Sequence, residues 1–323
     1  MKVFKIIYAI MGLILAAGSI LTGEYGLSEV NRDIYQRALS LDEDMQKLGF
    51  PQFSLADYKV RFYNGNCDYV VEASQDRIRK EDAVLDVFAG TTLEVEGEYQ
   101  VLIPTYEKFG ALFDLMGAAG EVSQGMAEGT MAFTEDSYSE NSHGASIWHE
   151  AFHAWQSNCF EKEISDLMGR VNMGKEETRE DVILGEADAK TAAVKDFEEE
   201  MEFLQKAWKA EDAQRKEYIV KALDIAKERE EMLSDSANAM EFYLENLEGS
   251  AMYVESQAYR LLEGNQAWQE YYMGEFQYEN GSGKYYHMGM LKGVLLDEIS
   301  PGWQKDFSMK EGLNELLRRA CEG

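Results

Sequence analysis

Apolar and polar residues follow two different periods along the chain, and the period predicts the local structure. Residues 28–48 carry apolar side chains at helical spacing after a helix-start signal, and a turn follows at 49–51, so we expect an amphipathic helix there. After Tyr58, apolar and polar residues alternate on both sides of an Asn-Gly-Asn turn, which is typical of a pair of strands. Residues 91–104 continue with β-branched and aromatic residues around Gly97 and predict further strands.

The next segment is less regular. Residues 105–116 are expected to form a helix, residues 117–129 are rich in glycine, and residues 130–134 fit a short strand. From Ser142 to the C-terminus the pattern predicts mostly helix.

Three apolar stripes in the acidic middle of the chain predict a run of three helices over residues 186–263. The many charges are expected on solvated faces, and an internal helical hairpin is a simpler interpretation than a coiled coil with a partner. The stripes comprise Val194, Phe197, Met201, Leu204 and Trp208, then Ile219, Ala222, Ala226 and Leu233, and finally Met240, Leu244, Leu247, Ala251, Val254, Ala258 and Leu261.

Together these patterns predict an α+β protein. Residues 24–135 are expected to form a small mixed α/β part, and residues 136–323 a mostly helical part. A length of 323 residues fits two domains or one large domain with a sizeable core.

The first residues have a different character. Lys2 and Lys5 precede a run of low polarity over residues 6–21 that ends in small residues, which is typical of a secretory signal peptide. At ~1.5 Å per residue this run reaches only ~24 Å, less than a ~30 Å hydrocarbon core, and an uncleaved N-terminal anchor is the alternative. We therefore expect residues 1–23 to be a signal peptide or anchor, and the protein to be extracytoplasmic, with this segment as its sole link to a membrane.

Charge and cysteine content narrow the function. The chain has 31 Lys and Arg against 60 Asp and Glu, a formal net charge of -29, so we do not expect nucleic acid as a partner. Its 45% hydrophobic and 12% aromatic residues are those of a packed protein and not of a disordered acidic tail. Its 3 cysteines are too few and too far apart for a disulfide framework or a cysteine zinc site.

A short motif in the helical part carries the strongest chemical signal. His149, Glu150 and His153 form the pattern His-Glu-x-x-His, which uses two of the 4 histidines. On a helix, residues four apart lie on one face about 6 Å apart along the axis, so both imidazoles can bind one metal ion while Glu150 reaches a metal-bound water. Ser142 or Ser146 can cap the required helix. Its apolar face comprises Trp148, Phe152 and Trp155.

This motif resembles that of the zinc metallopeptidases of the His-Glu-x-x-His class, in particular the gluzincins, in which a glutamate on a later helix is the third zinc ligand. The third histidine of the metzincins is absent after His153. The resemblance covers roughly residues 125–305. It implies Zn²⁺ as the metal and a zincin-like fold over residues 136–323, with a helical-hairpin insertion at about 190–240.

Two glutamates are candidates for the third ligand. Glu248 begins a segment similar to the Glu-Gly-x-Ala-x-Tyr segment of aminopeptidase-like gluzincins, and we favour it; the matching positions are Gly249, Ala251 and Tyr253. Gly249 is expected to let this helix approach the metal helix closely. Glu186 is the alternative, because it is nearer to His153 in sequence and opens a predicted helix.

Neither candidate is followed four residues later by the aspartate that orients the first histidine in some of these families. Met252 and Lys190 occupy the corresponding positions. A Tyr-x-x-Gly segment opening a late helix is a second resemblance, and it implies that Tyr286, with Gly289, donates to the oxyanion; Tyr285 and His287 are alternatives.

The implied function is that of an exported zinc-dependent metallopeptidase-like hydrolase acting on a peptide or protein. Glu150 would be the general base, and residues 129–134 would form the edge strand that binds an extended peptide. The alternative is an exported helical interaction protein in which zinc is structural or vestigial.

Overall fold

The computed structural model describes residues 26–87, 89–111, 138–171 and 180–323. The predicted signal or anchor segment at 1–23, the glycine-rich segment at 117–129 and the predicted strand at 130–134 lie outside these ranges. Of the helix predicted at 105–116, residues 106–111 are described and are helical.

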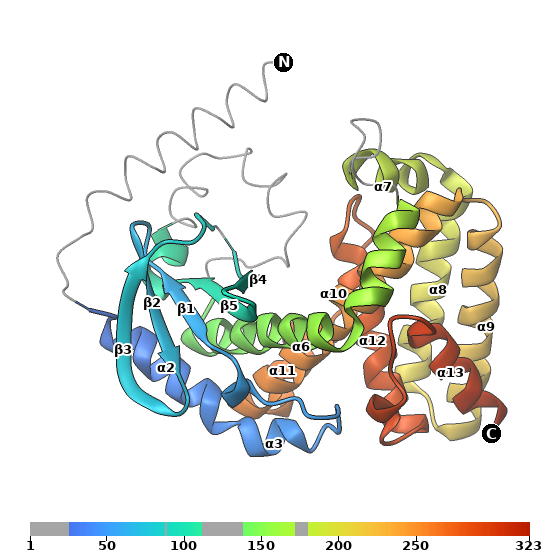
Figure 1. The fold of residues 1–323 in the computed structure, drawn as a ribbon. Helices are drawn as coiled ribbons and strands as arrows, with labels where there is room; N and C mark the ends of the chain where they lie inside the picture. Colours follow the sequence, from blue (N-terminus) through green and yellow to red (C-terminus); the bar gives the residue numbers. More distant parts are fainter. Residues whose placement is uncertain (1–25, 88, 112–137, 172–179) are drawn as a thin grey trace.

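Five strands of the N-terminal half form one mixed sheet in the order β3-β2-β1-β5-β4 (Figure 1). β1 and β5 are parallel, and the other neighbours are antiparallel. The two predicted strand pairs are confirmed as β1 with β2 and β4 with β5. The strands are β1 (Val60–Tyr63), β2 (Cys67–Glu72), β3 (Gln75–Asp82), β4 (Thr91–Val95) and β5 (Glu98–Pro104).

The unpredicted strand is β3. Its sequence, QDRIRKED, contains only Ile78 as a large apolar residue, so no alternation of apolar and polar residues predicts a strand here. It is a strand because its backbone pairs with β2, which is a tertiary contact.

The central strands place alternate residues on the two faces of the sheet. Val60, Phe62, Val101 and Ile103 belong to the main core, which also includes the helices. On the other face Leu102 belongs to a small second cluster, together with Tyr63 and Val87. The period of two in the sequence thus orients one face of the sheet toward the helices.

The helix predicted at 28–48 is found as two consecutive helices, α2 (Glu29–Ser40) and α3 (Asp42–Gln46). The Ser28 side chain caps α2 by accepting a hydrogen bond from the backbone N–H of Asn31. A short 3-10 turn, η1 (Leu55–Asp57), follows before β1.

The rest of the described chain is mainly helical, as predicted. Helix α6 passes along the sheet, contacts β4, β5 and α2, and continues into the helical half, where it packs on α10 (Figure 1). Its direction changes at Phe160, which has non-helical dihedral angles. The elements are α6 (Glu140–Val171), α7 (Glu180–Ala189), α8 (Thr191–Lys209), α9 (Asp212–Glu230), α10 (Asp235–Glu263), α11 (Asn265–Tyr272), α12 (Gly283–Ile299), η4 (Trp303–Lys305) and α13 (Gly312–Glu322).

The three predicted helices of residues 186–263 correspond to α8, α9 and α10, with the end of α7 before them. Most residues of their apolar stripes are buried, and Val194, Trp208 and Leu233 are partly buried. Leu261 is 47% exposed, so the prediction that it continues the buried stripe is wrong. Helices α8 and α9 pack on each other, while α10 packs on α6 and α12.

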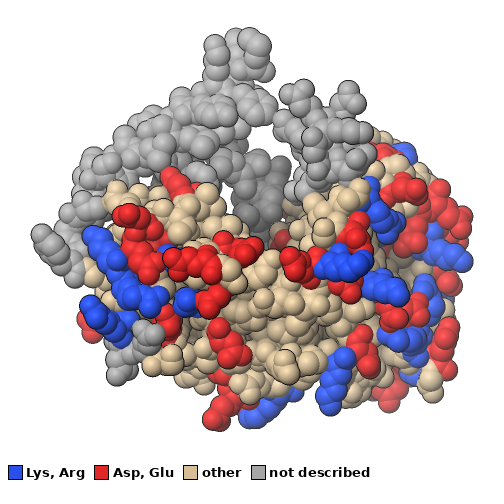
Figure 2. Space-filling model, in the orientation of Figure 1, with Lys and Arg blue, Asp and Glu red and all other residues tan. Residues whose placement is uncertain are grey.

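Acidic and basic side chains are mixed over both halves of the face shown in Figure 2. The net charge is thus spread over this face and is not gathered in one patch. Within the described ranges, no helix combines the length and the apolar content needed to cross a membrane.

Candidate metal centre

The helix that carries the motif begins with a pair of serines that cap each other. The Ser139 backbone N–H donates to Ser142 Oγ (2.7 Å), and the Ser142 N–H donates to Ser139 Oγ (3.1 Å). Ser146 lies inside the helix and donates to the Ser142 carbonyl (3.0 Å). The prediction that Ser146 caps the helix is therefore wrong, and Ser142 contributes from within the first turn.

An aromatic face holds this helix against the N-terminal half. Phe152 packs on Phe50 and Phe53, with ring centroids 4.7 and 5.2 Å apart. The indole N–H of Trp148 donates to the Ala38 carbonyl (3.1 Å), and that of Trp155 to the Pro51 carbonyl (2.9 Å). Because these rings fix the rotation of α6 about its axis, the direction of the motif side chains is fixed as well.

His149, His153 and Glu248 converge in the structure. The two Nε2 atoms are 3.0 Å apart, and Glu248 Oε2 lies 3.1 Å from His153 Nε2 and 3.5 Å from His149 Nε2. Zinc binds such atoms at about 2.0–2.2 Å, which puts tetrahedral ligands about 3.3–3.5 Å from one another. Among the described residues, these three form the group that could hold a metal ion.

The outer nitrogen of each imidazole faces an acceptor. His149 Nδ1 is 2.9 Å from Glu255 Oε2, and His153 Nδ1 is 2.8 Å from Gln156 Oε1. The Gln156 amide cannot turn over, because its Nε2 donates to the Leu247 carbonyl and to Ser250 Oγ, each at 2.9 Å. With Nδ1–H donating on both rings, both Nε2 lone pairs are left for a metal ion.

The electrostatics of the group favour positive charge. Burial lowers the pKa of His149, but Glu248 and Glu255 outweigh this effect and raise its pKa well above the usual value. Burial also lowers the pKa of His153, and Glu248 again raises it overall. The pKa of Glu248 is lowered despite its burial, because both imidazoles stabilise the carboxylate. The negative charge that retains protons on these rings also attracts a divalent cation.

Glu150 lies in a narrow slot beside the group. A Cβ atom on Gly90 would be 2.6 Å from Glu150 Oε1 and 2.7 Å from its Cγ, so only glycine leaves room. Thr92 Oγ1 donates to the Glu150 backbone carbonyl (2.6 Å), which ties the start of β4 to α6. Glu150 Oε2 is buried without a hydrogen-bond partner among the described residues, and burial raises its pKa. A buried carboxylate of raised pKa suits proton transfer.

The other residues predicted for the site differ in how close the fold brings them to the motif. Tyr286 stacks on His149, with ring centroids 6.3 Å apart. Tyr285 points elsewhere, since its hydroxyl donates to Glu241 Oε1 (2.6 Å). His287 lines a cavity at the start of α12. Glu186 binds Lys190 (2.7 Å) and the hydroxyl and N–H of Ser234, and lies outside the metal group. The structure thus brings Glu248 and Tyr286 to the motif, and not their alternatives.

The role expected for Gly249 is wrong. A Cβ atom there would lie 2.6 Å from the Gly289 Cα and 3.0 Å from the Tyr285 carbonyl, both in α12. The glycine therefore permits close contact between α10 and α12, and not between α10 and the metal helix. Gly289 is its counterpart, because a Cβ there would be 2.1 Å from the Glu245 carbonyl.

Sequence reasoning missed Glu255 and Gln156. Glu255 follows Glu248 by seven residues, two helical turns, and so lies on the same face of α10. Gln156 follows His153 by three residues and shares its face of α6. Helical spacing could have identified both as partners of the histidines, in place of the aspartate sought at position 252.

Comparison of the chain with protein-family models, with curated proteins and with solved structures gave no match. The function therefore has to be argued from the site itself.

Proposed function

We propose that this protein is an exported zinc-dependent hydrolase that cleaves peptide bonds. The observation that carries the proposal is the convergence of His149, His153 and Glu248 at zinc-ligand spacing, with both outer imidazole nitrogens already bonded. Export is proposed from the N-terminal sequence alone.

The donor set fits a catalytic zinc better than a structural one. Two imidazoles and a carboxylate, with three protein ligands among the described residues, leave a fourth position for water or substrate. The group is also accessible, since the side chains of His153 and Glu248 are 14% and 18% exposed. A zinc ion bound here would polarise the scissile carbonyl and lower the pKa of a bound water.

The chain's own groups supply the proton transfer and the orientation. Glu150 accepts the proton of the attacking water and delivers it to the leaving amine, and its Oε2, which has no partner among the described residues, is available for this role. Glu255 and Gln156 hold the imidazoles in the tautomer that ligation requires. Tyr286, which stacks on His149, would donate a hydrogen bond to the developing oxyanion.

The test compares the chain from residue 24 onward with its Glu150→Gln variant. Both should contain about one zinc per chain by elemental analysis. The wild-type protein should cleave members of a peptide library, and the variant should lose about two to four orders of magnitude in kcat. Equal turnover by the two proteins would refute the assignment of Glu150. One zinc per chain without any turnover would favour the interaction protein with a structural zinc.

A further inference from the structure

A cavity of about 280 Å³ lies between the C-terminal half of α8, residues 273–279 and the first turns of α12. Aromatic and methionine side chains form one part of its walls and polar side chains the other; the first part comprises Met201, Trp208, Tyr271, Tyr272, Phe276 and Met290. Sites for small molecules range from roughly 300 to 1,000 Å³. This cavity therefore has room for one bulky side chain, and not for a large cofactor.

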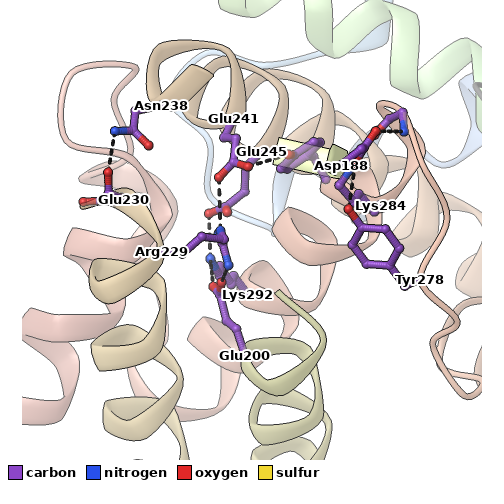
Figure 3. A network of polar contacts seen from close by, with 12 residues as sticks. Asp188, Glu200, Arg229, Glu230, Asn238, Glu241, Glu245, Tyr278, Lys284 and Lys292 are labelled. Carbon is purple, nitrogen blue, oxygen red and sulfur yellow. Dashed lines mark hydrogen bonds and ion pairs between the residues drawn. The ribbon is translucent and has the colours of Figure 1, made fainter. Parts of the chain in front are cut away.

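A buried ionic cluster sets the distance between the two helices that bound the cavity. Lys292 Nζ of α12 lies 2.8 Å from both Glu200 Oε1 of α8 and Glu245 Oε1 of α10. Glu200 and Lys292 are fully buried and directly neighbour two cavity residues, Met201 and Leu291. The ionic cluster, shown in Figure 3, comprises Glu200, Arg229, Glu241, Glu245 and Lys292.

A second set of bonds holds the segment before α12. Asp188 of α7 accepts hydrogen bonds from Tyr278 (2.6 Å), Lys284 (2.8 Å) and the Gly281 N–H (2.9 Å) (Figure 3). On the opposite side, Gln205 Nε2 donates to the Gly274 carbonyl (3.0 Å). Because these hydrogen bonds hold the walls together, the cavity is preformed and does not depend on a ligand to open it.

Three charged residues that line the cavity, Lys209, Glu275 and Glu279, are exposed to solvent. The buried polar groups of the cavity favour a neutral ligand. The charge of Lys284 is already paired with Asp188. His287 also lines the cavity, and no described residue hydrogen-bonds its ring. Burial lowers the pKa of His287, so the imidazole is neutral at pH 7 and offers one donor and one acceptor. A peptide group next to an apolar side chain matches this pair, while a carboxylate or phosphate does not.

The cavity adjoins the metal centre through one wall. Tyr272 lines the cavity, and its hydroxyl donates to Glu255 Oε1 (3.0 Å). The other oxygen of Glu255 binds His149 Nδ1 (2.9 Å). On α12, Tyr286 stacks on His149, and the next residue, His287, faces the cavity. A side chain in the cavity would thus contact Tyr272, which is linked to His149 through Glu255, and His287, which is adjacent in sequence to Tyr286.

We propose that this cavity binds a bulky apolar side chain of the peptide substrate, aromatic or of methionine or leucine size, and so selects the substrate. The inference rests on the proposed hydrolase function. Its binding step can be measured without catalysis.

Trp208 provides the readout, because it lines the cavity and its fluorescence should change when a ligand enters. The zinc-free and zinc-loaded proteins are each titrated with N-acetyl-phenylalanine amide, and N-acetyl-glutamate amide serves as the charged control. The phenylalanine derivative should bind both forms, and at least about tenfold more tightly than the glutamate derivative.

Gly274→Phe is the blocking variant. Gly274 lines the cavity, and among the described residues a Cβ there would meet the Glu270 carbonyl at 3.9 Å, an ordinary van der Waals contact, so the backbone can carry a side chain at this position. This variant should weaken binding by about tenfold or more, and Trp208→Phe should remove the fluorescence change. In cleavage assays Gly274→Phe should lower kcat/KM for peptides with phenylalanine or leucine near the scissile bond, and not for glycine peptides.

Two results would overturn the proposal: no fluorescence change at millimolar ligand in a folded protein, or a change that Gly274→Phe leaves intact. The two proposals are separated if Gly274→Phe abolishes ligand binding while the wild-type protein cleaves no peptide. The cavity would then be a ligand site, and the hydrolase function would fail alone.

Discussion

The metal centre and the ionic cluster lie on one face of α10, and they differ in how their buried carboxylates are compensated. Glu241 and Glu245 of the ionic cluster and Glu248 and Glu255 of the metal centre follow one another along this face, and all four are largely buried. A buried carboxylate is costly unless a positive or hydrogen-bonding partner compensates it.

In the ionic cluster the chain supplies the cations itself. Arg229 and Lys292 pair with Glu200, Glu241 and Glu245. In the metal centre Glu248 faces only imidazoles, and its neighbour Glu150 has an oxygen without a partner in the described part of the chain. A self-neutralised cluster is a structural element, whereas one that lacks a permanent cation could hold an external ion.

The largest effect that this comparison predicts is the loss of the metal in His153→Ala. Removing one of the two imidazoles breaks the three-ligand set, and the zinc content should fall from about one per chain to nearly none. Elemental analysis measures it, with His287→Gln as the control, because His287 lies outside the metal group and should leave the content unchanged. Equal zinc in His153→Ala would end the metal assignment.

Lys292→Met should affect the free energy of unfolding and not the metal stoichiometry. Without this lysine, Glu200 and Glu245 lose a common buried partner, which should cost about 3–5 kcal/mol in urea or thermal unfolding. Lys221→Met is the control, since the ion pair of Lys221 with Glu217 is exposed, and it should leave the free energy of unfolding close to that of the wild type. If both variants were equally stable, the ionic cluster would not be the structural element described above.

Glu255→Gln should weaken the metal centre without abolishing it. The amide still occupies the space beside His149 Nδ1 but no longer carries the charge that strengthens this ligand, so zinc affinity should fall by about 10–100-fold. Competition with a chromogenic chelator measures it. Glu263→Gln, at the exposed end of α10, should bind zinc like the wild type, and an unchanged affinity in Glu255→Gln would show that His149 needs no charged partner.

The smallest effect is expected for Gly90→Ala. The added methyl group would press on the Glu150 side chain and displace its carboxylate, so kcat should fall by about tenfold while zinc content stays unchanged. Gly110→Ala is the matched control, because no atom of the described residues lies within 4 Å of a Cβ at that position. Loss of zinc in Gly90→Ala would mean that the strand start supports the metal ligands and not the base.

Much of the secondary structure follows from the sequence because helices and strands leave short-range periods. Strand pairs β1–β2 and β4–β5 and helices α8, α9 and α10 were expected from alternation and from spacings of 3 and 4. β3 was not, since its residues are polar and only pairing with β2 makes it a strand. The break in the N-terminal helix at Leu41 likewise has no marker such as proline or glycine.

The candidate site likewise combines residues that local spacing predicts with residues that only tertiary contacts bring together. The sequence by itself determined His149, Glu150 and His153 as a unit, because a helix places residues four apart on one face whatever surrounds it. Only the tertiary structure decided that Glu248 and not Glu186 joins them, that Glu255 comes to lie beside His149, and that Tyr286 and not Tyr285 faces His149. These choices depend on how α10 and α12 pack on α6, and Gly249 and Gly289 allow the first two of these helices to touch. Local spacing cannot specify contacts between residues that lie some hundred positions apart, because they form only when separate buried faces close on one another.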